Sequence, residues 1–339
     1  AGSVALAWLT YKLVERRVRG GSRGAAKVGA LMVLGVAIGV FGYTADRKQG
    51  YPLRAYNQKF VSYKDSIKAP DRAAECFEIP YAYRKPQAWY CSLGPFDAPV
   101  KYFAYGDSHA LSLLPALEKF AQDTRVAMKF TGTSGCPSLV GLQSLRGHAL
   151  VEKYNCRALN DRIFEDVKAS GIENVILINR WTYYSGSIAR PPEFNPVARD
   201  PGKPIDGAGV TQAASRADLA WAIHNTVARY AQIGVRVIFV EDIPQQTFEP
   251  VDALRKSRAV EAEYLTLSVS RKEHEANQQW VNRVIRGTGA KVINFDDILC
   301  QHQVCPLVGD GKFWYSDDDH LSVAGALKVY PRLAERLRH

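Results

Sequence analysis

VKYFAYGDSH, residues 100 to 109, is a run of apolar and aromatic residues that passes into Gly-Asp-Ser-His at a single turn. Val100 to Tyr105 is typical of a buried strand, and residues 109 to 121 have the spacing of an amphipathic helix. Ser108 then lies after a strand and at the start of a helix, at the edge where open α/β sheets bind ligands. The pattern therefore predicts an exposed serine at a functional edge. His109 must point elsewhere, so we expect a structural or substrate-lining role for it.

The alternation of short apolar runs and longer amphipathic stretches continues to the C-terminus. Further strands are predicted at residues 126–130, 174–179, 235–240 and 291–294, and helices at 152–169, 211–233, 257–286 and 323–337. Strands that alternate with helices form parallel sheets. We therefore predict an α/β domain over residues 100–339, with three layers and a five-stranded parallel sheet. Residues 181–209 interrupt the pattern with Tyr, Gly, Pro and Arg and are predicted to be a surface insertion.

A second segment, Asp317-Asp318-Asp319-His320, lies near the C-terminus. Asp317 and His320 are three residues apart, so a tight turn can place both side chains on one side. The carboxylate can hold one imidazole nitrogen while the other faces Ser108, as a general base requires. We predict Ser108, Asp317 and His320 as a catalytic triad, with Asp317 chosen over its neighbours on spacing alone. Two plainer interpretations stay open: Ser108 as a helix N-cap, and His320 as a surface histidine in a solvated acidic loop.

Residues 28–45, VGALMVLGVAIGVFGYTA, form an uncharged run of 18 residues. At about 1.5 Å per residue, a helix of this length approaches the thickness of the bilayer hydrocarbon. We predict a transmembrane helix. A cleaved signal peptide is the main alternative, because a basic start before an apolar run fits both. A buried soluble helix is disfavoured because the run is apolar on all faces.

The formal net charge of +10 first suggests a nucleic-acid partner. Residues 1–27, however, contain six Lys and Arg and one Glu, a net of +5, so half of the excess lies beside the predicted membrane helix. Basic residues mark the cytoplasmic flank of such a helix. We therefore predict no nucleic-acid partner and place the chain after residue 46 outside the cytoplasm.

Two further segments are predicted on either side of this helix in the N-terminal third of the chain. Residues 1–13, AGSVALAWLTYKL, look like the end of another apolar segment, so residues 1–27 are predicted to be the end of an upstream membrane domain and a cytoplasmic basic loop. Residues 46–99 are rich in Tyr, Pro and Lys and hold no period for long. Because they also carry two cysteines and many aromatic residues, we expect an ordered periplasmic extension.

All six cysteines follow the apolar run, and their even number suits an oxidising compartment. Proximity in sequence suggests the pairs Cys76 with Cys91, Cys136 with Cys156, and Cys300 with Cys305. A zinc site is the alternative, but no Cys-x-x-Cys or Cys/His cluster has the usual ligand spacing. We predict three disulfides and no metal.

Three segments are similar to one known family. YGDSH at 105–109, SGCPSL at 134–139 and YSDDDHLSVAGA at 315–326 resemble the periplasmic SGNH (GDSL-like) domain that is fused to membrane acyltransferases of family 3. YKLVER at 11–16, with its basic loop and membrane helix, resembles the end of such an acyltransferase domain. The resemblance implies the flavodoxin-like SGNH-hydrolase fold, a Ser-His-Asp triad, and a bacterial inner-membrane protein with its catalytic domain in the periplasm.

The resemblance also implies an activity, the O-acylation of an envelope polysaccharide such as the O-antigen of lipopolysaccharide, usually with acetyl. The upstream membrane domain would deliver the acyl group, from acetyl-CoA, and this chain would need no cofactor of its own. Ser108 would form an acyl-serine and pass the acyl group to a sugar hydroxyl. Two alternatives stay open: a membrane-anchored periplasmic carbohydrate esterase, and a non-catalytic glycan-binding module.

The oxyanion hole is where the sequence departs from the superfamily that it resembles. That superfamily uses the Ser N–H, a second-block glycine and an asparagine in a Gly-x-Asn-Asp motif. Here Ser108 and either Gly132 or Gly135 can supply the first two, and we predict Gly135. The third predicted strand ends in Asn179-Arg180, with no Gly-x-Asn-Asp. Both residues are candidate donors, but both can equally be structural, with Arg180 paired to an acid.

Overall fold

The computed structural model describes residues 2–16, 24–48, 63, 68–79, 82–145, 155–188, 193–199, 209–256 and 261–338. The chain divides into two compact units, residues 1–61 and 62–339. Parts of several predicted segments lie outside the described residues: positions 17–23 of the basic loop, 49–62 and 64–67 of the extension, the helix start at 152–154, and 189–192 and 200–208 of the insertion.

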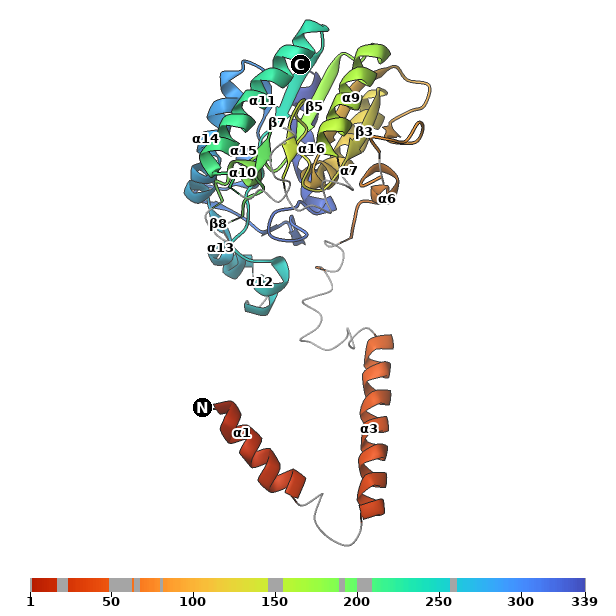
Figure 1. Ribbon diagram of the computed structural model, residues 1–339, viewed down its shortest axis with the longest axis vertical. Helices are drawn as coiled ribbons and strands as arrows, with labels where there is room; N and C mark the ends of the chain where they lie inside the picture. The colour runs from red at the N-terminus through yellow and green to blue at the C-terminus, as the bar shows by residue number, and fades with distance from the viewer. Residues whose placement is uncertain are drawn as a thin grey trace. The chain divides into compact units, whose positions relative to one another are not determined.

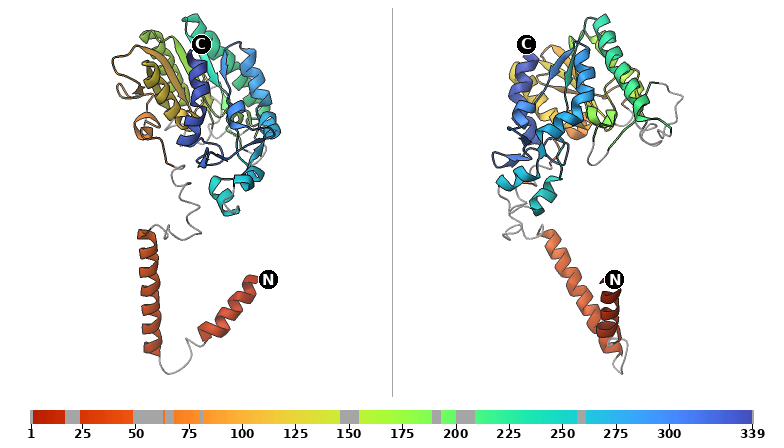
Figure 2. Two further views of the ribbon diagram at one scale, coloured as in Figure 1. Left: turned by 180° about the vertical axis from the view of Figure 1, so that it is seen from behind. Right: turned by 90° about the vertical axis from the view of Figure 1, so that its left-hand side faces the viewer.

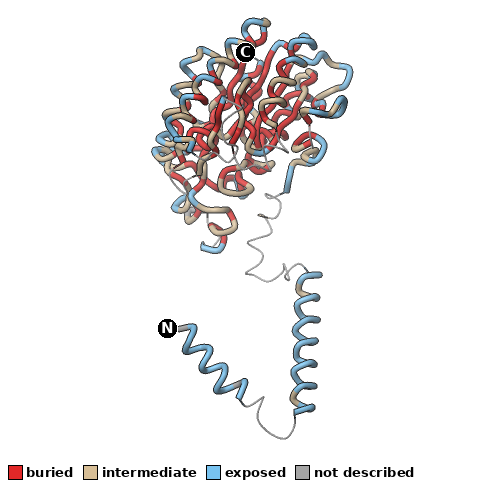
Figure 3. The backbone as a smooth tube through the Cα atoms, viewed as in Figure 1, coloured by how far each residue is buried: buried red, intermediate tan, exposed pale blue. Residues whose placement is uncertain are grey.

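The N-terminal unit is helical where it is described. Helix α1 spans Gly2–Thr10, a π-helical turn η1 spans Tyr11–Glu15, and helix α3 spans Gly24–Arg47. Helix α3 contains the predicted run 28–45, has a mean hydropathy of 2.0, and is long and apolar enough to cross a membrane by length and composition. None of its residues is buried, as the pale tube in Figure 3 shows. The predicted apolar helix is confirmed.

The second unit is built on a six-stranded sheet in the order β1-β3-β2-β5-β7-β9. The strands are β1 Cys91–Leu93, β2 Val100–Gly106, β3 Ala127–Gly132, β5 Asn174–Ile178, β7 Arg236–Val240 and β9 Lys291–Ile293. All pairs are parallel except β1 with β3. The five predicted strands are confirmed, and their order is the flavodoxin-like one.

Strand β1 is the part of the sheet that the sequence did not predict. It comes from the segment interpreted as an irregular extension, and it pairs through Cys91, Ser92 and Leu93 with β3. Three residues are too few to establish a period of two. The predicted extension therefore contributes an edge strand to the α/β sheet.

Helices cover both faces of the sheet and make three layers (Figures 1 and 2). Helices α9 Cys156–Ser170, α11 Gln212–Gln232 and α14 Arg271–Gly287 pack on one face, around a core that includes Phe103, Tyr105 and Phe239. Helices α7 Ser108–Thr124 and α16 Val323–Arg338 lie on the other face. Tyr102, which alternates with Phe103 along β2, donates its hydroxyl to Leu337 O of α16 at 2.9 Å.

The remaining elements are short. They are helices α6 Ala73–Cys76, α10 Trp181–Ser185, α12 Pro250–Lys256, α13 Glu261–Leu267 and α15 Asp296–Leu299, and strands β4 Gln143–Ser144, β6 Val197–Ala198, β8 Val269–Ser270, β10 Val304–Cys305, β11 Val308–Gly309 and β12 Lys312–Phe313.

The helix predicted at 257–286 is wrong as one element. Strand β8 separates α13 from α14 and pairs with β10. Ser270 has extended backbone and accepts the N–H of Glu273 at 3.1 Å, so it caps α14 as a new helix. A serine cap in the middle of an amphipathic pattern was the signal for the break.

The predicted surface insertion at 181–209 also differs from the structure at its start. All five residues of α10 are buried. The Trp181 indole donates to Val240 O at 2.7 Å, which fixes α10 beside the end of β7. Its aromatic residues, read as loop residues, belong to the core.

The six cysteines form the three expected pairs, Cys76–Cys91, Cys136–Cys156 and Cys300–Cys305. The first pair joins α6 to β1, the second joins the loop after β3 to α9, and the third closes the turn that carries β10. The first two pairs therefore fix loops at the end of the sheet where Ser108 lies.

Candidate active site

The turn between β2 and α7 presents Ser108. Gly106 is required there, because a Cβ atom at this position would lie 1.6 Å from Ile178 O of β5. Asp107, not Ser108, is the N-cap of α7, since its carboxylate accepts the N–H of His109 at 2.9 Å. The same carboxylate accepts the Tyr184 hydroxyl at 2.8 Å. The N-cap interpretation of Ser108 is therefore wrong, and its hydroxyl is available for another role.

The structure brings Ser108, His320 and Asp317 together in the predicted order. His320 Nε2 lies 2.7 Å from Ser108 Oγ, and His320 Nδ1 lies 2.8 Å from Asp317 Oδ2. The other oxygen of Asp317 accepts the backbone N–H groups of Asp319 and His320, at 3.0 and 2.7 Å. One carboxylate therefore shapes the turn and contacts the ring. The catalytic roles of the three residues stay a prediction.

A second carboxylate, which the sequence did not single out, contacts the same histidine. Asp319 Oδ1 lies 2.9 Å from His320 Nδ1, while Asp319 Oδ2 lies 2.7 Å from Arg180 Nη1 and 3.4 Å from His109 Nε2. His109 is buried beside His320, with ring centroids 5.0 Å apart. The structure therefore places His109 against Asp319, and His109 is not among the residues that line the pocket at Ser108. The three consecutive aspartates were the only sequence signal for Asp319.

These carboxylates control the charge of the histidine. Burial lowers the pKa of His320, but hydrogen bonds and Coulombic attraction to Asp317 and Asp319 outweigh burial and raise it to about 10. Burial acts to raise the pKa of Asp319, yet hydrogen bonds from His109 and His320 hold that pKa well below its usual value. At neutral pH the resting imidazole is therefore protonated, and the neutral form that can accept the Ser108 proton becomes more abundant as the pH rises.

A further carboxyl group titrates near neutrality beside this cluster. Burial, with Coulombic repulsion from Asp318, Asp317 and Asp319, raises the pKa of Glu249 to about 7. Burial and Asp319 also raise the pKa of Asp318, whose carboxylate accepts the Gln245 amide at 3.2 Å. The histidine therefore lies in a strongly acidic environment.

Asn179 and Arg180 are both engaged with the protein. Asn179 Oδ1 accepts the Ser138 N–H at 3.0 Å, and its Nδ2 donates to Ser138 Oγ at 2.6 Å. Arg180 Nη1 lies 2.7 Å from both Asp319 and Glu193. Pairing of Arg180 with an acid is thus the geometry found. Neither residue is among those that line the pocket at Ser108, and their oxyanion role stays a prediction.

Gly135 lies in the loop after β3, beside the same pocket. Its φ of +69° is in the left-handed region that favours glycine, and its carbonyl accepts the Asn195 amide at 3.1 Å. The neighbouring Ser134 lines the pocket. The N–H of Ser108, in the first turn of α7, has no intrahelical acceptor. Gly135 itself is not among the residues that line the pocket, and the oxyanion roles of Ser108 and Gly135 stay a prediction.

The pocket at Ser108 has a volume of about 360 Å³. Its lining residues come from the segments on either side of α6, from α7, from the loop after β3 and from the His320 turn into α16: Lys68, Ala69, Pro70, Phe77, Glu78, Ser108, Leu111, Ser112, Ser134, Ser316, Asp317, His320, Leu321 and Val323. Pockets of this size accept small-molecule ligands. The Cys76–Cys91 pair fixes the wall that Phe77 and Glu78 supply.

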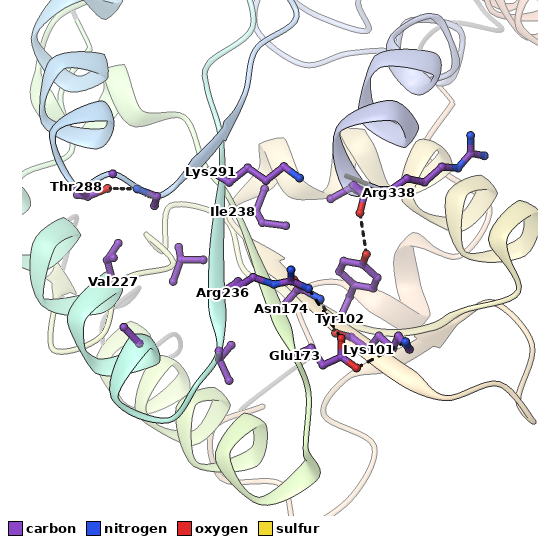
Figure 4. Close-up of a pocket in the computed structure, with 16 residues that line it drawn as sticks. Lys101, Tyr102, Glu173, Asn174, Val227, Arg236, Ile238, Thr288, Lys291 and Arg338 are labelled. Atoms are coloured by element: carbon purple, nitrogen blue, oxygen red, sulfur yellow. Dashed lines mark hydrogen bonds and ion pairs between the residues drawn. The ribbon is translucent and has the colours of Figure 1, made fainter.

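A larger pocket of about 590 Å³ lies at the opposite edge of the sheet. Figure 4 shows Lys101, Glu173, Arg236 and Lys291 around it, near the amino ends of the parallel strands. None of the residues predicted from the sequence as part of a site lines it.

Among the residues that the structure describes, two groups of side chains are close enough together to consider a metal ion, His109 with Asp319 and His320, and the three consecutive aspartates. Their ring nitrogens and carboxylate oxygens already contact Ser108, Arg180, Gln245 and one another. We assign no metal ligand to these residues.

Residues 75–335 match the model of a family described as SGNH domain (fused to AT3 domains). No curated protein sequence matches the chain. The sequence match and the sheet order agree with the predicted SGNH-hydrolase fold, so that prediction is confirmed.

Solved structures are similar in fold. The periplasmic domain of a lipopolysaccharide acetyltransferase from Salmonella ser. Paratyphi A has a TM-score of 0.55 and 14% identity, over 84% of this chain and 98% of that one. A catalytic mutant of an acetylxylan esterase from Geobacillus stearothermophilus has a TM-score of 0.40 and 13% identity, over 71% and 94%. A GDSL-like lipase from Bacteroides thetaiotaomicron has a TM-score of 0.35 and 12% identity, over 72% and 92%. At these identities the similarity concerns the fold alone, and the last two TM-scores show only weak structural similarity.

Proposed function

The chain belongs to the family of SGNH domains fused to AT3 domains, and we propose on this basis that it is an O-acyltransferase of the cell envelope. It moves an acyl group, most simply acetyl, to a hydroxyl of a polysaccharide such as the O-antigen of lipopolysaccharide. The observation that carries the proposal is the continuous hydrogen-bonded series from Asp317 through His320 to Ser108 at the wall of a pocket.

The proposed reaction has two displacement steps. Neutral His320 accepts the Ser108 proton at Nε2 while Oγ attacks the acyl carbonyl carbon of the donor. The donor's leaving group departs with that proton, and an ester on Ser108 remains. A sugar hydroxyl then attacks this ester as His320 accepts its proton, and the proton returns to Ser108 when the acyl–sugar ester forms. Atoms and protons balance, and Ser108 is regenerated.

The acyl donor would come from a second protein domain. Members of this family are fused to AT3 domains, and we propose that such an upstream membrane domain delivers acetyl from acetyl-CoA. Helix α3, apolar and exposed along its length, suits a membrane anchor. Three disulfides in the second unit suit the periplasm. We therefore propose an inner-membrane protein with a periplasmic catalytic domain.

Esterase activity is the second candidate. Ser108 is partly exposed and the Asp317 side chain is 38% exposed, so water can reach the reacting groups. If water replaces the sugar hydroxyl in the second step, the same residues hydrolyse the acyl-serine. Transfer and hydrolysis then differ only in the acceptor.

Acetyl transfer to purified envelope polysaccharide tests the proposal. The full 339-residue chain in detergent micelles would receive p-nitrophenyl acetate as a soluble donor, and NMR would quantify polysaccharide acetyl groups. We expect transfer by the unaltered chain and by Ser170→Ala, a control at the exposed end of α9. We expect loss of about 1,000-fold or more in Ser108→Ala.

The outcomes separate the candidates. Acetate release without polysaccharide acetylation favours the esterase. Transfer that survives unchanged in Ser108→Ala contradicts the nucleophile assignment.

A further inference from the structure

One ring nitrogen of His320 faces two carboxylates. Asp317 Oδ2 lies 2.8 Å from Nδ1 and Asp319 Oδ1 lies 2.9 Å from it. Both oxygens can accept the Nδ1–H, so the ring is held by two anions where the mechanism above needs one. Either carboxylate, or both, can stabilise the imidazolium that forms when Ser108 loses its proton.

The two carboxylates differ in burial. The Asp319 side chain is 8% exposed, whereas that of Asp317 is 38% exposed. Water screens charge, so an ion pair of equal length is stronger where water is excluded. The second oxygen of Asp317 also accepts hydrogen bonds from two backbone N–H groups of the turn. The geometry therefore gives Asp319 at least an equal electrostatic effect on the ring.

A buried carboxylate needs a counter-charge, and Arg180 supplies it. Arg180 Nη1 lies 2.7 Å from Asp319 Oδ2, and its side chain is 12% exposed. Glu193 contacts the same nitrogen at 2.7 Å. The Nε and Nη2 atoms of Arg180 are buried and have no hydrogen-bond partner among the residues that the structure describes. These unpaired donors cost folding free energy, and the ion pairs of Arg180 with Asp319 and Glu193 act against that cost.

The backbone around Arg180 is fixed by the ends of two neighbouring strands. Its N–H donates to the Asp107 carboxylate after β2, at 2.9 Å. The next two N–H groups, of Trp181 and Thr182, donate to the buried Asp242 carboxylate after β7, both at 2.7 Å. Asp107 thereby links the Ser108 turn directly to the segment that contains Arg180, the ion-pair partner of Asp319.

We propose that Asp319, whose negative charge Arg180 balances, is a positioning residue for His320. Together with Asp317, Asp319 fixes the Nδ1 side of the ring so that Nε2 faces Ser108, and it stabilises the imidazolium in the transition state. This inference rests on the proposed function, because it concerns the base of the same site.

Several charged and titratable groups surround His320. They come from its own turn, from α7, from the segments after β5 and β7, and from the pocket wall: Asp317, Asp318, Asp319, His109, Arg180, Glu193, Asp242, Glu249, Tyr63 and Lys68. Carboxylates outnumber cations in this set. Because an anion stabilises the imidazolium and a cation destabilises it, loss of the Asp319 charge must lower the pKa of His320, and loss of the Arg180 charge must raise it.

Imidazole titration in four variants tests the proposal. The full chain, ¹⁵N-labelled at histidine, would be titrated by NMR in detergent micelles, with the His320 signal assigned from His320→Gln. We expect Asp319→Asn to lower the His320 pKa by about one unit or more and Arg180→Met to raise it. Arg180→Lys keeps the cation and should stay near the unaltered value. Asp318→Asn, the matched control on the same turn, should shift the pKa less than Asp319→Asn.

Kinetics provides the second readout. With p-nitrophenyl acetate at a pH where His320 is neutral, Asp319→Asn should lower kcat by about 10- to 100-fold, because the imidazolium loses a partner. KM should change less than about twofold, because Asp319 does not line the pocket. A structural defect alone would not lower the His320 pKa in Asp319→Asn and raise it in Arg180→Met.

Two results would overturn the proposal: an unchanged His320 pKa in Asp319→Asn, or shifts of the same sign in Asp319→Asn and Arg180→Met. If Asp319→Asn does not fold, Arg180→Met decides, since a lowered or unchanged pKa there contradicts the pairing. If neither the unaltered chain nor any variant turns over an acyl ester, the proposed function fails, while the titration still decides this inference.

Discussion

A pocket lies at each end of the parallel strands. The larger pocket lies at the amino ends, away from the hydrogen-bonded series of Asp317, His320 and Ser108. At the amino ends of the strands the volume is about 590 Å³, and at the carboxyl ends it is about 360 Å³. Around the larger pocket, Glu173 pairs with Lys101 at 3.7 Å and with Arg236 at 3.9 Å, between side chains that are at least 44% exposed (Figure 4). At the smaller pocket the contacts of His320 measure 2.7 to 2.9 Å.

The difference comes from how the chain is connected. At the carboxyl ends, loops after β2, β3, β5 and β7 converge with the last turn before α16, so residues 108, 180 and 320 meet in space. At the amino ends the long exposed cations extend into solvent, and exposed ion pairs of this kind contribute little. Convergence of short, partly buried contacts identifies a reactive site better than volume does.

Removal of His320, the proposed base at the carboxyl ends of the strands, should cause the largest loss of activity. His320→Ala should lower kcat/KM for p-nitrophenyl acetate by about 10,000-fold, because Ser108 loses its proton acceptor. The matched control is His224→Ala, at an exposed position of α11, which should retain the unaltered rate. Retention of more than a tenth of the activity in His320→Ala would contradict a catalytic role for the residues at the carboxyl ends of the strands.

The pH dependence should show that the carboxylates at this edge control the base. Because the pKa of His320 is raised from 6.5 to about 10, the neutral base becomes about tenfold more abundant per pH unit above neutrality until the pH approaches that value. The kcat/KM for the same ester, corrected for spontaneous hydrolysis, should rise accordingly. A plateau already reached at pH 7 would show that the acidic groups do not act on His320.

The same raised pKa has a consequence for stability. The unfolded chain binds the His320 proton less tightly than the folded chain, so the stabilisation is fully present below about pH 6.5 and is lost as the pH rises to about 10. The difference in Tm between the unaltered chain and His320→Gln should therefore be largest near pH 6 and vanish above pH 10. Scanning calorimetry checks this, and a difference that grows with pH would contradict the sign.

The disulfide beside the smaller pocket should affect both stability and substrate binding. Replacement of Cys76 and Cys91 by Ser opens a link across 15 residues, which costs about 3 kcal/mol of unfolding free energy. KM should rise several-fold, because this pair fixes the wall that contains Phe77 and Glu78. Replacement of Cys300 and Cys305, which do not line the pocket, should leave KM unchanged. Equal effects on KM would show that the wall does not contact substrate.

The smallest effect on activity is expected for a substitution at the amino ends of the strands. Lys291→Gln removes a cation from the larger pocket and should change acyl transfer by less than about twofold, because surface substitutions away from a site have small effects. Measurement of transfer to polysaccharide, rather than ester hydrolysis alone, checks this. A tenfold loss would mean that the amino edge takes part in binding the acceptor.

Local patterns predicted much of this structure. The strand that precedes Ser108 and the spacing from Asp317 to His320 are signals contained within a few residues, and the three cysteine pairs follow from proximity alone. Strand β1 was missed because three residues cannot establish a period, and the break before α14 was missed because Ser270 lies within a longer amphipathic pattern.

The contacts of Arg180 and Asp319 could not be predicted, because they depend on the fold bringing residues 139 positions apart within 2.7 Å. Three consecutive aspartates gave no way to decide which of them would contact His320. The structure assigns contacts to two of them, Asp317 and Asp319. Sequence spacing therefore located the turn, and only the tertiary packing distinguished its carboxylates.

The proposed reaction requires Ser108 to carry the acyl group. The full chain would be mixed with p-nitrophenyl acetate, quenched in acid within the first turnover, digested and analysed by mass spectrometry. We expect an acetyl group on the peptide that contains Ser108, with none there in Ser108→Ala. Continued turnover without acetylation of Ser108, or acetyl on a different residue that Ser108→Ala does not abolish, would contradict it.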